Sequence, residues 1–492
     1  MFTLIPDQNQ KSELFYTENI HWYQYFKLFK VPKKDYDWFL DFVKENRIFY
    51  TISTELDQHI VIKVPTQFEK IFRTINRIEE INDFPFLWWD TELIKRKKSK
   101  DITWIKNGYK DFESLETIFR YLEKKYPSSV RISVLGKSHQ QRPIYLLHIT
   151  NHNSDFPYKI PIYVNSLHHG NEILSVEYVL DLVFLLLDEE SVHLVNPPSQ
   201  VIQKLSLEER KEFLEKLDIY LIPVVNPDGL ERFWYESLHN GRKNGRNVDL
   251  NRNYPFHWHT SVVKASDVVP NSYMYRGVAP ASEQEVQLIM NFLKQNPCSF
   301  GLSYHTYANK ILFPYTIDTL WNPIPDRALY FGKKLLHQVV SFRKRPYTLT
   351  RKLYSVSGTD QDWIFNQTGC IAYIVEGSMN TPPFEVAKWS IVGSRRIWYN
   401  LFRIAIDEPR VEIEFFDSNY KIIKPKIQVK NFYFFENEEI SNYYKNRWIF
   451  YLGNAKKLNL MLSFGKTFHK EIEIECSKIC REKMNLTIRT NK

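Results

Sequence analysis

An apolar, β-branched run at residues 160–164 ends at a polar turn that carries two histidines, a glycine and a glutamate, and a second apolar run begins at Ile173. The first run is typical of a buried strand, and the second, which continues to Leu187, is typical of a buried helix. Open α/β sheets bind ligands at the carboxyl ends of their strands, which is where this pattern places His169 and Glu172. We therefore expect an α/β fold with polar chemistry at this turn.

His169 and Glu172 are three residues apart at the start of a helix, so an imidazole nitrogen and a carboxylate oxygen can reach one cation, and both suit zinc. Alone the pair is weak evidence, because 14 His and 57 acidic residues in 492 positions give about 1.6 such pairs by chance. A second pair, His152 and Asp155, lies in a polar loop typical of solvated turns. The first pair gains weight from residues elsewhere in the chain.

Composition places the chain among globular proteins. Its 492 residues, 43% of them hydrophobic, allow roughly two to four domains with sizeable cores. The formal net charge of +9 is spread along the chain apart from a short basic run at 95–98, so we expect no nucleic-acid partner. No apolar window is both long enough and free of charge, so no transmembrane segment is expected.

The compartment is predicted from the N-terminus and the cysteines. The first residues lack a basic region followed by an apolar stretch, so we expect no signal peptide. Cys298, Cys370, Cys476 and Cys480 form no disulfide framework by their spacing, although the last two could pair. Both observations favour a reducing compartment, and we predict a cytoplasmic protein.

Three regions differ in their pattern. Residues 1–95 follow a β-α-β-β-α-β order with a closing strand expected at 84–89, which is the split βαβ arrangement. Residues 105–408 alternate strands and helices, which argues for an α/β sheet with helices on both faces. Residues 409–492 break into short alternating strands, as in a small β-sandwich.

Two strands of the middle region deliver further chemistry. A strand near residues 301–304 is followed at once by His305, a third candidate ligand. Two His and one Glu leave a fourth zinc position for water, the arrangement of catalytic zinc. An apolar strand at 371–375 delivers Glu376, which is either a paired structural acid or a general base.

A loop that precedes both of these strands in the sequence is rich in arginine. Arg242, Arg246 and Arg252 lie within 11 residues, among Gly and Asn. Planar guanidinium groups bind carboxylates and oxyanions bidentately, so this loop predicts an anion site. An exposed basic loop is the alternative, but it explains less well the interleaved Asp249 and Asn251.

These motifs, in this order, resemble the zinc metallocarboxypeptidases of the carboxypeptidase A/B and N/E superfamily from about Tyr109 to Arg403. The resemblance implies one zinc ion per chain, held by His169, Glu172 and His305. It implies that Glu376 is the general base and Arg242 polarises the scissile carbonyl. It also implies three residues that bind the substrate's terminal carboxylate or close over it, namely Asn251, Arg252 and Tyr354.

The resemblance is closer to the N/E branch, because of the His-Gly-Asn-Glu run and Gln361 before Asp362. It implies a central mixed β-sheet with helices on both faces, followed by a transthyretin-like β-sandwich. Thr316 stands where that branch carries an acidic residue that selects basic chain ends, and Asp318 is the nearest acid. The resemblance therefore predicts no particular terminal residue.

The implied activity is hydrolysis of the C-terminal peptide bond of peptides or proteins by a zinc-activated water with a glutamate base. Two alternatives remain open: a zinc amide hydrolase for a non-protein substrate such as peptidoglycan stem peptides, and a zinc-retaining binding protein without turnover. The region 1–95 is either similar to a pro-segment or a fused accessory domain.

Overall fold

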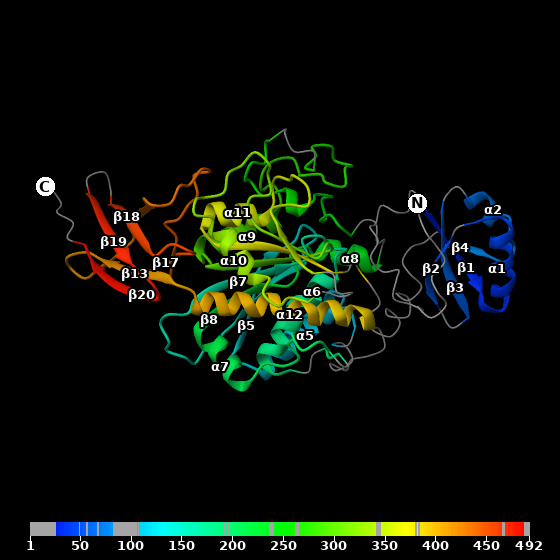
Figure 1. The fold of residues 1–492 in the computed structure, drawn as a ribbon, viewed down its shortest axis with the longest axis horizontal. Helices are drawn as coiled ribbons and strands as arrows, with labels where there is room; N and C mark the ends of the chain where they lie inside the picture. The colour runs from blue at the N-terminus through cyan, green and yellow to red at the C-terminus, as the bar shows by residue number, and fades with distance from the viewer. Residues whose placement is uncertain are drawn as a thin grey trace.

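The computed structural model of the protein describes residues 26–48, 50–55, 58–65, 68–81, 106, 108–189, 192–194, 197–235, 241–260, 265–340, 346–378, 381, 384–464 and 468–486. Its sheets follow one another along the long axis of the molecule (Figure 1). The basic run at 95–98 lies outside the described residues.

The N-terminal sheet has four strands in the order β2-β3-β1-β4. Phe29 of this sheet packs in one core with Phe39 and Phe72 of the two helices that follow β1 and β3, and all three are fully buried. The strand expected at 84–89 lies outside the described residues, and β4 pairs with β1 instead. The elements are β1 (Phe26–Pro32), α1 (Tyr36–Glu45), β2 (Thr51–Glu55), β3 (His59–Pro65), α2 (Glu69–Arg73) and β4 (Glu79–Ile81).

The central sheet is mixed and has eight strands in the order β11-β10-β12-β9-β7-β8-β6-β5. The three strands β12, β9 and β7 run parallel to one another, whereas β5, β6 and β10 each have antiparallel neighbours. The strands are β5 (Val130–Lys137), β6 (Pro143–Ile149), β7 (Ile160–Ser166), β8 (Leu217–Ile222), β9 (Phe300–Thr306), β10 (Lys310–Leu312), β11 (Thr348–Thr350) and β12 (Ile371–Gly377).

Helices cover both faces of this sheet. Neighbouring residues of a strand point to opposite sides, so consecutive residues of β9 face different helices. Tyr304 of β9 packs against Tyr178 of α6, with ring centroids 5.4 Å apart. The preceding residue, Ser303, bonds to Asn165, which in turn bonds to the first residue of α11. The helices are α5 (Phe112–Lys125), α6 (Leu174–Leu187), α7 (Leu207–Lys216), α8 (Pro227–Tyr235), α9 (Gln284–Gln295), α10 (Arg327–Leu335), α11 (Asp360–Thr368) and α12 (Phe384–Asp407).

The predicted α/β class with a mixed sheet is confirmed. The central strand β7 and helix α6 are buried along their whole length, as their continuous apolar sequences predict. Two charged residues inside α6 are tolerated because each has a buried partner: Glu177 contacts Lys110, and Asp181 binds Arg395 bidentately at 2.7 Å.

The C-terminal region forms two small sheets around its own core. Strand β14 pairs with β13, whereas β15 pairs with β18 of the other sheet. The strands are β13 (Arg410–Phe416), β14 (Ile422–Ile423), β15 (Lys426–Val429), β16 (Tyr443–Tyr444), β17 (Arg447–Tyr451), β18 (Lys457–Phe464), β19 (Phe468–Glu475) and β20 (Ile479–Asn485).

Asp218 of β8 joins the central sheet to the C-terminal sheets. Its side chain is almost fully buried. It contacts His148 Nε2 (2.9 Å), Tyr444 Oη (2.6 Å) and Lys445 Nζ (2.7 Å). Burial alone would raise the pKa of Asp218, but these contacts hold it well below its usual range. The ionised carboxylate therefore stabilises the contact between the two regions.

We expect Asp218→Asn to lower the free energy of unfolding by about 2–3 kcal/mol, because a buried acceptor of three hydrogen bonds loses its charge. A depressed pKa stabilises the fold above the unfolded carboxyl value of about 3.9, and this contribution is lost as the pH falls. Urea unfolding at pH 7 and pH 2 tests both statements, because the contribution is lost only as the pH falls toward the low pKa of the folded state. The exposed Asp41→Asn is the control, and an equal midpoint for the two variants at pH 7 would contradict the prediction.

The cysteines differ from expectation. Cys298 is bonded to Cys370, and Cys476 to Cys480, so no cysteine is free. The first pair is not visible in sequence spacing, because it joins the start of β9 to the start of the neighbouring strand β12. Disulfides are typical of oxidising compartments, whereas the cytoplasmic location remains an untested prediction.

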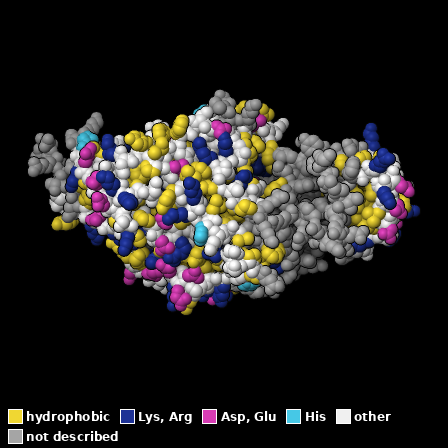
Figure 2. Space-filling model, viewed as in Figure 1, with side chains coloured by type: hydrophobic (Ala, Val, Ile, Leu, Met, Phe, Trp, Pro, Cys, Tyr) yellow, Lys and Arg dark blue, Asp and Glu magenta, His cyan; other side chains and the backbone are white. Residues whose placement is uncertain are grey.

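The surface in Figure 2 carries basic and acidic side chains interspersed among apolar ones. Within the described residues, no helix has both the length and the apolar character needed to cross a bilayer.

Candidate metal centre and active site

The site lies where three parallel strands of the central sheet end. His169 and Glu172 follow β7, His305 lies near the end of β9, and Glu376 lies near the end of β12. The register of β12 with β9 sets Glu376 directly beside His305. Carboxyl ends of parallel strands meet at one edge, so residues far apart in sequence converge there.

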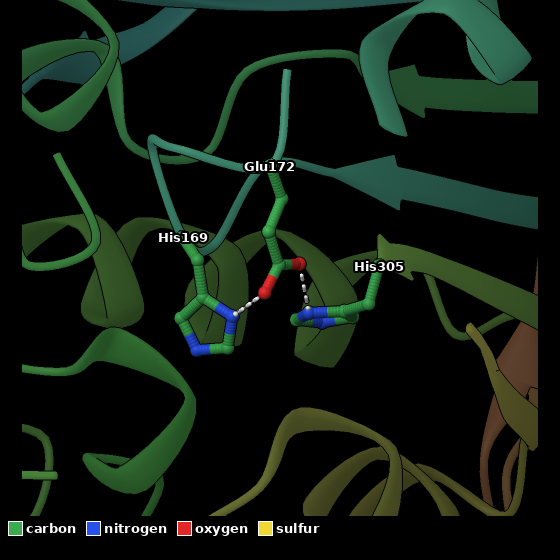
Figure 3. A group of neighbouring side chains, drawn as sticks. All are labelled: His169, Glu172 and His305. Carbon is green, nitrogen blue, oxygen red and sulfur yellow. Dashed lines mark hydrogen bonds and ion pairs between the residues drawn. The ribbon is translucent and has the colours of Figure 1, made fainter. Parts of the chain in front are cut away.

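The three predicted metal ligands form one cluster. The Glu172 carboxylate lies between the two imidazoles, 2.7 Å from His169 Nδ1 and 3.0 Å from His305 Nδ1 (Figure 3). One ligand atom from each residue lies within 4.8 Å of the others, and all three residues are buried. This is the only such cluster of His, Cys, Asp or Glu found within the described ranges.

The residues behind the cluster orient it for a cation. His169 Nε2 lies 3.1 Å from Asp249, so the proton on that nitrogen leaves Nδ1 free to act as a ligand. The backbone N–H of Thr306 donates to Glu172 at 3.1 Å. Burial alone would raise the pKa of Glu172, but the two histidines hold it well below its usual range. An ionised carboxylate between two imidazole nitrogens is the donor set that suits zinc.

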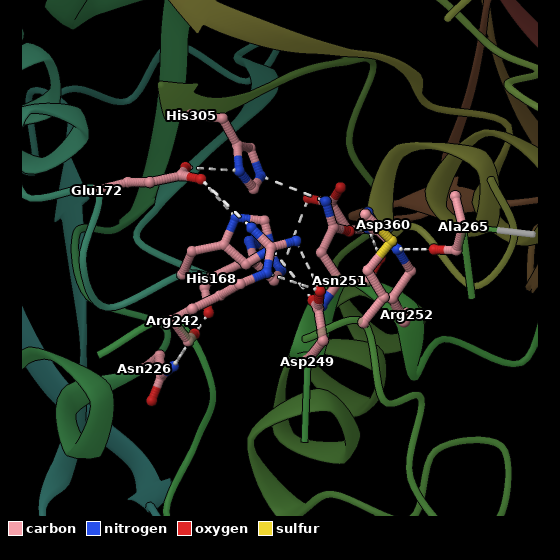
Figure 4. Close-up of polar contacts among 12 residues, drawn as sticks. His168, Glu172, Asn226, Arg242, Asp249, Asn251, Arg252, Ala265, His305 and Asp360 are labelled. Carbon is pink, nitrogen blue, oxygen red and sulfur yellow. Dashed lines mark hydrogen bonds and ion pairs between the residues drawn. The ribbon is translucent and has the colours of Figure 1, made fainter. Parts of the chain in front are cut away.

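Arg242 lies beside this cluster and is held rigidly. Its Nε and Nη2 donate to Asp249 at 3.0 and 2.6 Å, and Nη1 lies 3.8 Å from Glu172 (Figure 4). Its guanidinium carbon is 4.6 Å from the ring centre of Tyr273. Burial opposes the charge, but Asp249 keeps the pKa of Arg242 well above its usual value. The guanidinium of Arg242 is thus a fixed positive charge that can face negative charge as it develops during a reaction.

The predicted carboxylate-binding residues form a second group next to the first. Asn251 Nδ2 is 3.4 Å from His305 Nε2, so the two groups are in contact. Arg252 donates from Nη2 to the hydroxyl of Tyr354 at 3.2 Å. Tyr354 is 44% exposed, unlike its two buried neighbours, so it lies on the solvent side of this group.

Glu376 is partly buried beside the metal cluster. Burial raises its pKa to about 7, against the nearby positive charge of His305 and Arg242. A carboxyl group with a pKa near the working pH is suited to both accept and donate a proton. All eight residues predicted for the site are therefore brought together.

Three further residues at the site were not predicted. His168 stacks on His305, with ring planes 16° apart, and contacts the hydroxyl of Tyr254 at 3.0 Å. Asp360 donates its backbone N–H to Asn251 at 2.8 Å. Tyr273 packs on Arg242. The only signal for His168 in the sequence is that it stands next to His169 in the turn. That position does not reveal that the side chain of His168 faces the site.

A family model described as "Zinc carboxypeptidase" matches residues 115–386, more than half of the chain. The chain belongs to the zinc carboxypeptidase family. All eight predicted site residues fall within the matched segment. The zinc carboxypeptidase resemblance drawn from the motifs is confirmed at this level.

Individual zinc carboxypeptidases match more distantly. Carboxypeptidase A6 of Mus musculus is 26% identical over 269 residues, 52% of this chain and 57% of that protein. Carboxypeptidase B2 of Mus musculus is 26% identical, covering 52% of this chain and 61% of that protein. Carboxypeptidase D of Mus musculus is 25% identical, covering 56% of this chain and 19% of that protein. The chain thus spans less than two thirds of each, and closeness to the N/E branch stays a prediction.

Solved structures show the same fold. Carboxypeptidase A from Helicoverpa armigera has a TM-score of 0.51 at 18% identity and covers 77% of this chain and 97% of that one. Thrombin-activatable fibrinolysis inhibitor has a TM-score of 0.52 at 18% identity and covers 77% and 98%. At these identities the likeness concerns the zinc carboxypeptidase fold alone.

Proposed function

We propose that the protein is a zinc-dependent metallocarboxypeptidase that removes the C-terminal residue of peptides or proteins. The observation that carries the proposal is the contact between the His169–Glu172–His305 cluster and the group formed by Asn251, Arg252 and Tyr354. A hydrolytic centre next to a carboxylate-binding group suits a bond one residue from a chain end.

The residues that would hold zinc are His169, Glu172 and His305. A bound zinc ion would supply Lewis-acid chemistry to a water molecule and to the scissile carbonyl. Glu376 accepts a proton from the attacking water and passes it to the leaving amine, which its pKa of about 7 allows in both directions. Arg242 donates to the carbonyl oxygen as negative charge develops, and its bond to Asp249 fixes its position beforehand.

The second group explains why the enzyme would act on chain ends. Arg252 and Asn251 bind the terminal carboxylate, and Tyr354 lies against Arg252 on the solvent side. Only the last residue of a chain offers a carboxylate at that place, so internal peptide bonds are not held for attack.

Neither Thr316, which stands where the N/E branch carries an acid, nor Asp318, the nearest acid in the sequence, supports a preference for basic chain ends. Thr316 is buried and donates its hydroxyl to Asp362 at 2.6 Å. Asp318 is 55% exposed and paired with Lys352. Burial raises the pKa of Asp362 to about 7, so it offers less than a full charge at neutral pH. We therefore propose no preference for Lys or Arg.

Release of single C-terminal residues from a mixed peptide library tests the function. The expected result is release from free-acid peptides and none from the same peptides with amidated ends. Cleavage of amidated peptides at equal rates would contradict an exopeptidase. The pattern of released residues gives the terminal preference directly.

Arg252→Met should lower kcat/KM for free-acid peptides by about 10²–10³, because charged hydrogen bonds contribute about 1.5–3 kcal/mol each. The matched control is Arg246→Met, because Arg246 lies in the same loop and is 45% exposed. The prediction fails if the two variants lose activity equally.

No specific observation favours either alternative, a zinc hydrolase for peptidoglycan stem peptides or a binding protein without turnover. The N-terminal region is either similar to a pro-segment or an accessory domain, and both readings remain proposals. The two readings are separated by comparing the peptidase activity of the full chain with that of a form that begins after residue 95. Removal of an inhibitory segment would raise the activity.

A further inference from the structure

A cavity lies between the central sheet and the C-terminal sheets, away from the metal cluster. It is lined by the start of β9, the end of α11, the first residue of α10 and strands β16 and β17. Two arginines, Arg327 and Arg447, line it, and no Asp or Glu is among its described lining residues. The lining therefore carries positive charge without a counter-charge of its own.

Arg327 is buried without a carboxylate partner. No Asp or Glu oxygen among the described residues lies within ion-pair distance of its guanidinium, and Nε has no hydrogen-bond partner. The guanidinium instead packs on the face of Phe450, with its carbon 3.9 Å from the ring centre, and Nη1 makes a 3.4 Å contact with the Tyr451 carbonyl. A buried guanidinium is costly unless its charge is compensated.

The unpaired part of Arg327 is the edge that binds oxyanions. Two other buried arginines use this same edge: Arg242 donates from Nε and Nη2 to Asp249, and Arg395 does so to Asp181. In Arg327 neither Nε nor Nη2 makes a hydrogen bond within the described part of the chain. A planar fork of two N–H groups matches the two oxygens of a carboxylate, phosphate or sulfate.

Arg447 adds a second incompletely matched charge. It shares one carboxylate, Glu412, with Arg410 and Arg481, so three guanidinium groups face a single negative charge. The Nε atom of Arg447 is also buried without a partner. Burial lowers the pKa of Arg327 to about 10, so its guanidinium remains charged at neutral pH.

We propose that this cavity binds a small oxyanion through Arg327 and Arg447. The anion would bond directly to the Nε edge of Arg327, whose charge Asp326 and Glu438 offset only from beyond ion-pair distance, and it would join α10 to the C-terminal sheets. Phosphate, sulfate and short carboxylates share the required chemistry. Because the cavity is built from both regions, binding should stabilise their contact.

Thermal unfolding of the full-length, zinc-loaded protein tests the proposal, with sodium phosphate titrated at constant ionic strength. We expect a saturable rise in Tm of about 2–3 °C at a hundredfold excess over Kd. Sulfate and acetate titrations identify which oxyanion binds most tightly. A change in Tm that follows ionic strength alone would overturn the proposal.

Variants separate this cavity from other anion sites. Arg327→Gln should abolish the rise in Tm, and Arg327→Lys, which keeps the charge but loses the fork, should weaken binding at least about tenfold. The control is Arg131→Gln, because Arg131 is exposed on β5. Phosphate bound elsewhere, including near Arg242 and Arg252, would stabilise all variants equally, and that result would overturn the proposal.

A direct measurement covers the case in which Arg327→Gln does not fold. Crystals of the wild-type protein grown with selenate should give an anomalous peak next to Arg327. Selenate peaks at other places only, with water against Arg327, would overturn the proposal.

Discussion

Replacing Glu376 by Gln is expected to lower kcat/KM by about 10²–10⁴, the usual contribution of a positioned general base. Gln has nearly the same shape, so the strand end and the register with His305 should persist. The amide cannot accept the proton of the attacking water. Because Glu376 is not among the three residues proposed to hold zinc, the zinc content of the variant should equal that of the wild type.

The measurement is steady-state hydrolysis of a free-acid peptide together with metal analysis of the same sample. The matched control is Glu113→Gln, because Glu113 is an exposed carboxylate in the first turn of α5. A variant that keeps more than about a tenth of wild-type activity would exclude Glu376 as the base. Wild-type protein that binds zinc but releases no residue from any peptide would favour the binding alternative.

Removal of the metal is expected to abolish activity and to lower Tm. The Glu172 carboxylate and two imidazoles are buried within 4.8 Å of one another, so a cation that joins them stabilises the folded state. At a thousandfold excess over Kd, a ligand contributes about 4 kcal/mol, which is roughly 4 °C for a chain of this length. Zinc added back after dialysis should restore both properties.

Two variants sharpen this experiment. His305→Ala should show no response of Tm to a chelator, since one ligand is gone. Asp249→Ala should keep the three ligands but bind zinc about 10–100-fold more weakly, because His169 loses the partner that orients it. Activity that survives complete removal of metal would contradict the proposed function. It would not bear on the proposal of an oxyanion site between the central and C-terminal sheets.

Local sequence pattern predicted much of the fold and the site. Strand β7 and helix α6 follow from apolar runs whose pattern needs no distant partner. The order of the motifs identified the family and all eight residues that the structure brings together. These features depend on neighbours within a few residues, which is why a single sequence reveals them.

The tertiary structure alone decided which distant groups meet. Cys298 pairs with Cys370 because their strands are neighbours, and Asp218 binds Lys445 because the C-terminal sheets dock against β8. His168 entered the site because the turn aims both of its histidines inward. Arg327 is a buried charge without an ion-pair partner because Phe450, from the C-terminal sheets, packs over its guanidinium. Burial and pairing of charges depend on packing between elements, and spacing along the chain carries no measure of either.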